Sequence, residues 1–151
     1  MDDVNIDEKI KMTSHAEKLQ CITTILKNKT NTAPIIFIKK TISHQVPKQQ
    51  QKSKLNQQKL ETIDIGNLNE ILELDVKNKT CTAEPGVTFS DLVQATLRHN
   101  LVPYTVPELK TITIGGAVAG CSVESMSYKY GGFHDSCLEY EIITASGKIL
   151  K

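Results

Sequence analysis

The feature that most constrains the fold of this chain is a β-branched run that ends in paired glycines, Thr111-Ile112-Thr113-Ile114-Gly115-Gly116. Glycine has no Cβ and tolerates positive φ, so the backbone at such a pair can come very close to another group. The small residues that follow, as far as Gly120, can open a helix whose free N–H groups and dipole favour a phosphate. The alternative is a tight strand-to-helix junction that packs against a neighbouring segment. The spacing is not G-x-G-x-x-G, so a dinucleotide-binding Rossmann fold is not supported.

The segments before the glycine pair alternate between helical and extended patterns. Apolar residues at helical spacing predict one amphipathic helix over Thr13–Lys27, and the apolar run Ile35–Ile38 after Pro34 predicts a buried strand. Lys39–Lys59 is rich in lysine and glutamine and poor in apolar residues, which predicts a long loop.

Downstream of this loop, short strands surround a second helix. Thr88 and Asp91 have the spacing of a capping box, which predicts a helix over Ser90–His99. Alternation and turn residues predict strands at Glu61–Ile65, Ile71–Val76, Lys79–Glu84, Leu138–Thr144 and Lys148–Leu150, with Lys77-Asn78 as the turn of the central pair. This order predicts an α+β fold.

Composition excludes several classes of protein. The 151 residues suffice for one domain, and a net charge of +1 gives no electrostatic reason to expect a nucleic-acid partner. The chain has no run of 18 apolar residues, which a membrane-spanning helix would need. The acidic N-terminus lacks the apolar core of a secretory signal, so we expect a cytoplasmic location. The four cysteines form no C-x-x-C pair, so we expect reduced thiols and no metal site.

The order of motifs resembles a known flavoprotein family. The central hairpin leads into Glu84-Pro85-Gly86-Val87-Thr88, a helix, Pro107-Glu108-Leu109 and then the paired glycines, as in the flavin domain of the vanillyl-alcohol oxidase and p-cresol methylhydroxylase (PCMH) superfamily. Within it, Gly120-x-x-x-Glu124-Ser125 followed by Lys129-Tyr130-Gly131-x-Phe133 resembles the Diminuto-like delta(24)-sterol reductases. The resemblance extends from about Leu68 to Leu150.

This resemblance implies an FAD-binding PCMH-type domain built from two small α+β subdomains. The domain would occupy residues 31–151, after an N-terminal helix region at residues 1–30, and would be incomplete at its C-terminus. The implied activity is reduction of a carbon–carbon double bond, with NADPH and a hydrophobic alkene as partners of the full-length enzyme. Catalytic residues would lie beyond this chain, so none is assigned and residues 1–151 alone are expected to give no turnover. A non-catalytic remnant of a truncated flavin domain, or an interaction module that uses Lys39–Lys59, is the alternative.

The resemblance also implies which residues line the cofactor. The implied FAD-contacting residues are Thr113, Ile114, Gly115, Gly116, Ala117, Val118, Ala119, Gly120, Cys121, Ser122, Val123, Glu124 and Ser125. Their amides would contact the pyrophosphate and their small side chains would leave room for it. For Glu124, a flavin-pocket role and a structural hydrogen bond stay open beside simple solvation.

Five residues carry groups that could react. Covalently flavinylated relatives have an Arg-Gly-Gly-Gly-His-Ser type loop, whereas this chain has Lys40 to Gln45 without glycines, so we expect His44 to be a loop histidine and not a flavin linkage. Tyr128, Tyr130 and His134 could act as acids or bases, but tyrosines beside glycines more often pack. Cys121 could be redox-active, yet a small buried filler is the expected role.

Overall fold

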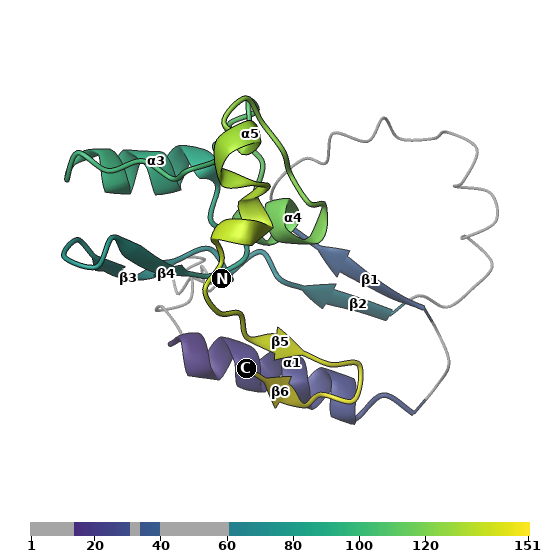
Figure 1. Ribbon diagram of the computed structural model, residues 1–151. Helices are drawn as coiled ribbons and strands as arrows, with labels where there is room; N and C mark the ends of the chain where they lie inside the picture. Colours follow the sequence, from purple (N-terminus) through teal and green to yellow (C-terminus); the bar gives the residue numbers. More distant parts are fainter. Residues whose placement is uncertain (1–13, 31–33, 40–60) are drawn as a thin grey trace, which may run out of the picture.

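The computed structural model describes residues 14–30, 34–39 and 61–151, and these form an α+β arrangement of short elements (Figure 1). Its helices are α1 (His15–Lys27), α3 (Phe89–Leu97), α4 (Ile114–Ala119), α5 (Ser127–Tyr130) and the 3₁₀ helix η2 (Phe133–Ser136). Its strands are β1 (Ile35–Ile38), β2 (Glu61–Asp64), β3 (Ile71–Asp75), β4 (Thr80–Ala83), β5 (Ile142–Ile143) and β6 (Ile149–Leu150). The strands described form three two-stranded sheets.

Helix α1 begins where its capping residues place it. The Ser14 hydroxyl accepts from the Glu17 amide, and the Glu17 carboxylate accepts from the Ser14 amide at 2.7 Å, which completes a capping box. The sequence therefore placed the helix correctly, although it begins at His15 and not at Thr13. Its apolar face forms a core cluster with the segment around β2, made of Ile22, Leu26, Ile63 and Leu68.

Strands β1 and β2 pair in parallel, with Ile35 opposite Glu61 and Ile38 opposite Asp64. A parallel pair needs a long connection. Here the connection contains Lys39–Lys59, the segment predicted to be a loop, of which residues 40–59 lie outside the described residues, so the loop stays a prediction.

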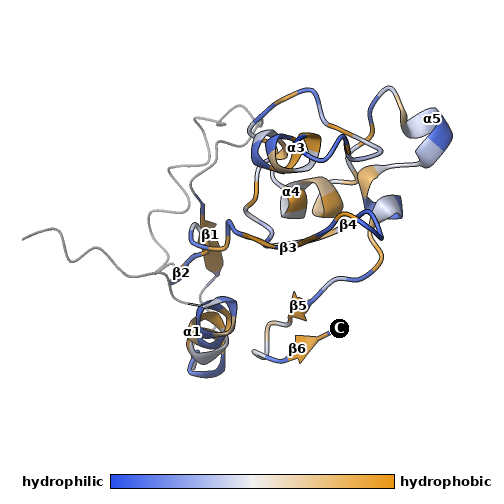
Figure 2. Cartoon of the chain, turned by 90° about the vertical axis from the view of Figure 1, so that its left-hand side faces the viewer, coloured by the Kyte–Doolittle hydropathy of each residue, from blue (hydrophilic) through white to orange (hydrophobic). Residues whose placement is uncertain are grey.

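Strands β3 and β4 form the predicted antiparallel hairpin, with Asp75 opposite Thr80. The Asp75 carboxylate accepts from the Asn78 amide at 2.9 Å, and Lys79 closes the turn with a φ of 57°. Helices α3 and α4 lie over one side of this hairpin, and α1 lies beyond its other side (Figures 1 and 2).

A second core cluster lies between this hairpin and the two helices. It is made of Val87, Phe89, Leu92, Ala117 and Phe133. The rings of Phe89 and Phe133 meet edge to face, with centroids 4.8 Å apart. This cluster fixes α4, because Ala117 in the middle of that helix is fully buried.

The C-terminal part differs from the expectation. The predicted strand Leu138–Thr144 is reduced to β5, because only Ile142 and Ile143 find partners, in β6. Leu138 is 85% exposed, so the alternation of apolar residues there does not report a buried face. The four-residue helices α5 and η2 were not expected.

Among the described residues, no helix combines the length and apolar character needed to cross a bilayer.

Candidate functional site

The glycine segment folds as a strand-like residue, a short helix and a loop. Thr113 is extended and caps α4, where its hydroxyl accepts from the Gly116 amide at 3.2 Å. An isolated bridge joins Thr113 to Thr88, the cap of α3, so the first turns of the two helices are tied together. Helix α4 has six residues and ends at Gly120.

The amides at the start of α4 are engaged within the protein. The Ile114 amide donates to the Val87 carbonyl and the Gly115 amide to the Pro85 carbonyl, both at 2.9 Å. With the Gly116 amide bound to its cap, the first three amides of α4, which the sequence assigned to a pyrophosphate, already have acceptors. The segment therefore offers a ligand close approach to its backbone and not a set of free helix-terminal amides.

The two glycines of the pair have different environments. A Cβ at Gly115 would lie 2.6 Å from the Pro85 Cβ, so Gly115 fits the alternative of a tightly packed junction. A Cβ at Gly116 would meet only the Thr113 hydroxyl, at 3.1 Å, and Gly116 is exposed. Gly116 is the glycine that leaves space for a ligand.

One face of α4 carries almost no side-chain bulk. Ala117 points into the core, whereas Gly116, Ala119 and Gly120 are exposed. No side chain on this exposed face is larger than a methyl group, so a flat group can lie against the backbone there. These residues fit the FAD that the resemblance implies, by steric access.

The loop after α4 corrects one expectation. Cys121 is exposed and has a φ of 49°, so it is not a buried filler. Ser122 anchors the loop to η2, because its carbonyl accepts from the Phe133 amide at 2.9 Å. Val123 is 65% exposed beside it. The exposed small-residue face of α4 thus continues into an exposed loop.

Glu124 has a structural hydrogen bond. Its carboxylate accepts from the Glu108 amide at 3.2 Å, and its own amide donates to the Ser127 hydroxyl at 2.9 Å. The first of these bonds holds the segment with Pro103 and Pro107, before α4, against the segment after it, and the second is local. This geometry favours the structural alternative left open for Glu124.

The aromatic residues near Gly131 divide between packing and exposure. Tyr130 stacks on Tyr104 with centroids 4.5 Å apart, as expected of a packing residue. Tyr128 is 84% exposed, so the packing role expected for it is wrong. His134 has an Nδ1 atom that is buried and has no partner among the described residues. His44 lies outside the described residues.

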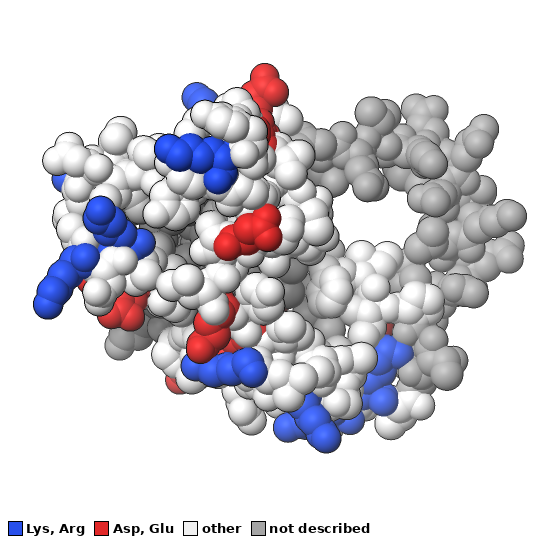
Figure 3. All heavy atoms as spheres, in the orientation of Figure 1, with Lys and Arg blue, Asp and Glu red and all other residues white. Residues whose placement is uncertain are grey.

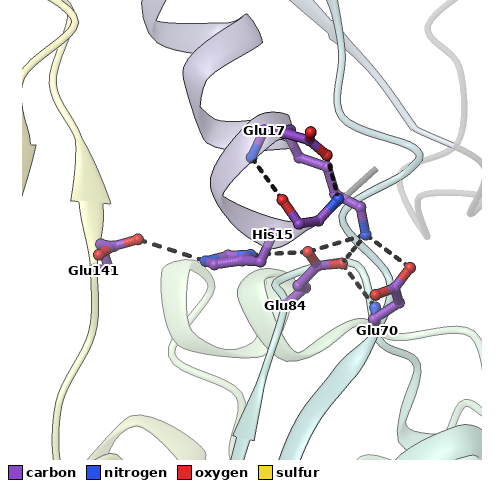
Figure 4. Close-up of polar contacts among 7 residues, drawn as sticks. His15, Glu17, Glu70, Glu84 and Glu141 are labelled. Atoms are coloured by element: carbon purple, nitrogen blue, oxygen red, sulfur yellow. Dashed lines mark hydrogen bonds and ion pairs between the residues drawn. The ribbon is translucent and has the colours of Figure 1, made fainter. Parts of the chain in front are cut away.

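A buried charged cluster that the sequence did not reveal lies at the end of β4 (Figure 4). The Glu84 side chain is fully buried, and its carboxylate accepts from Lys18 Nζ at 3.0 and 3.1 Å and from the Glu70 amide at 2.8 Å. His15 Nδ1 lies 2.9 Å from the same carboxylate, and its Nε2 lies 3.6 Å from Glu141. Lys18 also pairs with the Glu70 carboxylate at 2.9 Å. The cluster joins α1 to the β3–β4 hairpin and to the segment before β5.

The charges in this cluster stabilise one another. Burial raises the pKa of Glu84, but the bonds from His15, the Glu70 amide and Lys18 outweigh it and leave the pKa below its ordinary 4.5. Burial lowers the pKa of Lys18, but the two glutamates outweigh it and leave that pKa above 10.5. Both groups are therefore charged at neutral pH.

Two further features of the described residues concern metal ligands and the thiols of Cys81 and Cys137. Within the described ranges, no group of three potential metal ligands comes together. Burial raises the pKa of the Cys81 and Cys137 thiols, which disfavours the thiolate. On the face in Figure 3, positive and negative side chains are interspersed among uncharged ones.

Comparisons with known proteins identify the family to which most of the chain is similar. Residues 49–151 match the model of a family described as FAD binding domain. The chain is 43% identical to the delta(24)-sterol reductase homolog dhcr-24 of Caenorhabditis elegans over 82 residues, which are 54% of this chain and 16% of that protein. It is 35% identical to the delta(24)-sterol reductase of Arabidopsis thaliana over 89 residues, 59% of this chain and again 16% of the relative.

The fold is also shared with a solved structure. An alkyldihydroxyacetonephosphate synthase superposes with a TM-score of 0.65 over 91% of this chain and 24% of the other, at 20% identity. The matches to the two reductases span about a sixth of their length. The family match covers most of the described β-strands together with α3 and α4. This chain therefore belongs to the FAD binding domain family, with a fold of the PCMH type.

Proposed function

We propose that this chain forms the part of a flavin-dependent reductase that holds FAD along the exposed face of α4, and that the whole enzyme reduces a carbon–carbon double bond in a sterol-like alkene with NADPH. The observation that carries the proposal is the exposed small-residue face at Gly116, Ala119 and Gly120. This face lies within the residues that match the FAD binding domain family, in a chain that over part of its length is similar to sterol reductases. FAD would supply the hydride chemistry when bound.

The residues of this chain would orient the cofactor and not react with it. Gly116 and Gly120 keep the surface of α4 free of side chains, so a ring or ribose can contact the backbone. Thr113 and Ala117, both buried, hold the helix in place. The engaged amides of Ile114 and Gly115 leave the phosphates to donors elsewhere in the enzyme. We expect the attachment to be noncovalent.

A single side chain placed on α4 tests this proposal. Gly116→Val adds bulk on the exposed face, where its Cβ would meet only the Thr113 hydroxyl. We expect the purified chain to bind FAD, measured by quenching of flavin fluorescence. The variant should bind FAD at least about tenfold more weakly, a loss of about 1.4 kcal/mol in binding free energy, because the valine side chain would keep the cofactor from the backbone.

The control is Ala145→Val, which adds similar bulk at an exposed residue of the β5–β6 turn. Both variants should keep the far-ultraviolet circular dichroism of the parent chain. Equal FAD affinity in the parent and Gly116→Val would show that α4 does not contact the cofactor.

A further inference from the structure

We infer that the buried cluster around Glu84 positions helix α4, so that α1, which precedes the residues matching the flavin-domain family, is a working part of the flavin site. The inference deepens the proposed function and rests on it for the flavin measurement alone. Glu84 acts here as a positioning residue, since it contacts α4 only through the turn that follows it.

The first step runs from α1 to Glu84. His15 and Lys18 lie on the first turns of α1 and both reach the Glu84 carboxylate, whose other partner is the Glu70 amide (Figure 4). Glu84 also shares a main-chain bond with Glu70, through its own amide, at 2.9 Å. Its position is thus set from the helix side and from the hairpin side at once.

The second step runs from Glu84 to α4. Residues 84–87 form a tight turn, because the Val87 amide donates to the Glu84 carbonyl at 3.1 Å. The two carbonyls that receive the first amides of α4 belong to Pro85 and Val87 in this same turn. The Pro85 ring in addition packs against Gly115. A displacement of Glu84 therefore moves the surface on which α4 begins.

The third step is electrostatic. A buried carboxylate without partners is costly, and removing one member of a buried ion pair leaves the other uncompensated. In this protein the compensating cation, Lys18, comes from α1, which lies before the family match at residues 49–151. The turn that seats α4 is thus stable in its present position only when α1 is docked.

The test compares Glu84→Gln with Glu73→Gln, the same change at an exposed residue of β3 in the same hairpin. Amide hydrogen exchange is measured by NMR in the flavin-free chain. In Glu84→Gln we expect the Ile114 and Gly115 amides, which bind the turn, to exchange at least about tenfold faster relative to the Ile65 amide, which bonds to Ile38 beside β2. Glu73→Gln should leave this ratio unchanged.

Two further measurements separate positioning from general stability. Lys18→Met removes the cation from the other side of the pair and should produce the same local change, which decides the question if Glu84→Gln does not fold. In the parent chain the exchange rate of the Ile114 and Gly115 amides relative to that of Ile65 should also rise as pH falls below 4.5, where the Glu84 carboxylate takes up a proton. Glu84→Gln should lack this rise. The charged groups that face Glu84 are His15, Lys18 and Glu70, with Glu141 beyond His15.

Each outcome decides the matter. Faster exchange confined to Ile114 and Gly115, together with at least about tenfold weaker FAD binding than in Glu73→Gln, supports the inference. Equal acceleration at Ile65, or no acceleration in either cluster variant, overturns it. If the parent chain binds no FAD, the proposed function fails, while the exchange measured without flavin still decides whether the cluster positions α4.

Discussion

The ring of Pro85 occupies the space where a side chain at residue 115 would begin, because a Cβ on Gly115 would lie 2.6 Å from the Pro85 Cβ. The Pro85 carbonyl accepts from the Gly115 amide at 2.9 Å, so the contact involves the main chain on both sides. The paired glycines therefore have separate tasks, with Gly115 serving the packing of α4 and Gly116 its exposed face.

This division predicts unequal effects of one added methyl group. Gly115→Ala should destabilise the chain by about 1–3 kcal/mol, because a backbone and a proline ring must shift. Gly116→Ala gains about 0.5–1 kcal/mol of helix propensity against a small movement of the Thr113 hydroxyl. Urea denaturation should rank Gly115→Ala below Gly116→Ala by at least about 1 kcal/mol. Equal urea midpoints for the two variants would mean that the Pro85 ring moves aside at little energetic cost.

The cap of α4 gives a second prediction. Thr113→Ala removes the hydroxyl that accepts from the Gly116 amide, at a residue that is 7% exposed. We expect a loss of about 1 kcal/mol in the free energy of unfolding. Thr113→Ser keeps the acceptor and should retain most of that stability. A serine variant as unstable as the alanine variant would assign the effect to the lost methyl group.

The aromatic pair in the second core cluster gives a third prediction. Phe133 packs edge to face on Phe89 beneath α4, and Phe133→Ala should cost about 3–5 kcal/mol through the lost contacts and the cavity. Tyr128→Ala, at an 84% exposed residue of α5, should change stability by less than about 0.5 kcal/mol. Thermal unfolding followed by circular dichroism measures both. A small loss in Phe133→Ala would indicate that the cluster closes over the gap.

The sequence could predict those elements whose signal is local. Ser14 and Thr88 begin their helices through side-chain bonds to residues three positions ahead, so the caps of α1 and α3 are visible without any tertiary information. The β3–β4 hairpin is equally local, since Asp75 and Asn78 define its turn. For the same reason α3 ends near its predicted boundary, at Leu97.

The sequence could not predict features that depend on distant partners. Glu84 meets His15 and Lys18 across 69 and 66 residues, so nothing in its neighbourhood distinguishes it from a surface glutamate. The engagement of the Gly115 amide by Pro85 is likewise a contact between separate segments. Local residue patterns therefore locate the glycine segment, but they do not show that its first amides bond to Pro85 and Val87 and not to a phosphate.

The buried cluster gives the last prediction, on the pH dependence of stability. Because the pKa of Glu84 is lower in the folded chain than its ordinary 4.5, its contribution is complete above that pH and is lost as pH falls through the lower, folded value. Because the pKa of Lys18 is raised above 10.5, its contribution is present below that pH and is lost as pH rises through the higher, folded value. Urea midpoints measured across this range should therefore fall at both ends. Glu84→Gln should lower the midpoint at neutral pH and flatten the acid limb, since it has no carboxylate to protonate. An acid limb as steep in Glu84→Gln as in the parent chain would place the responsible carboxylate elsewhere, and the exposed Glu73→Gln should keep the parent's full profile.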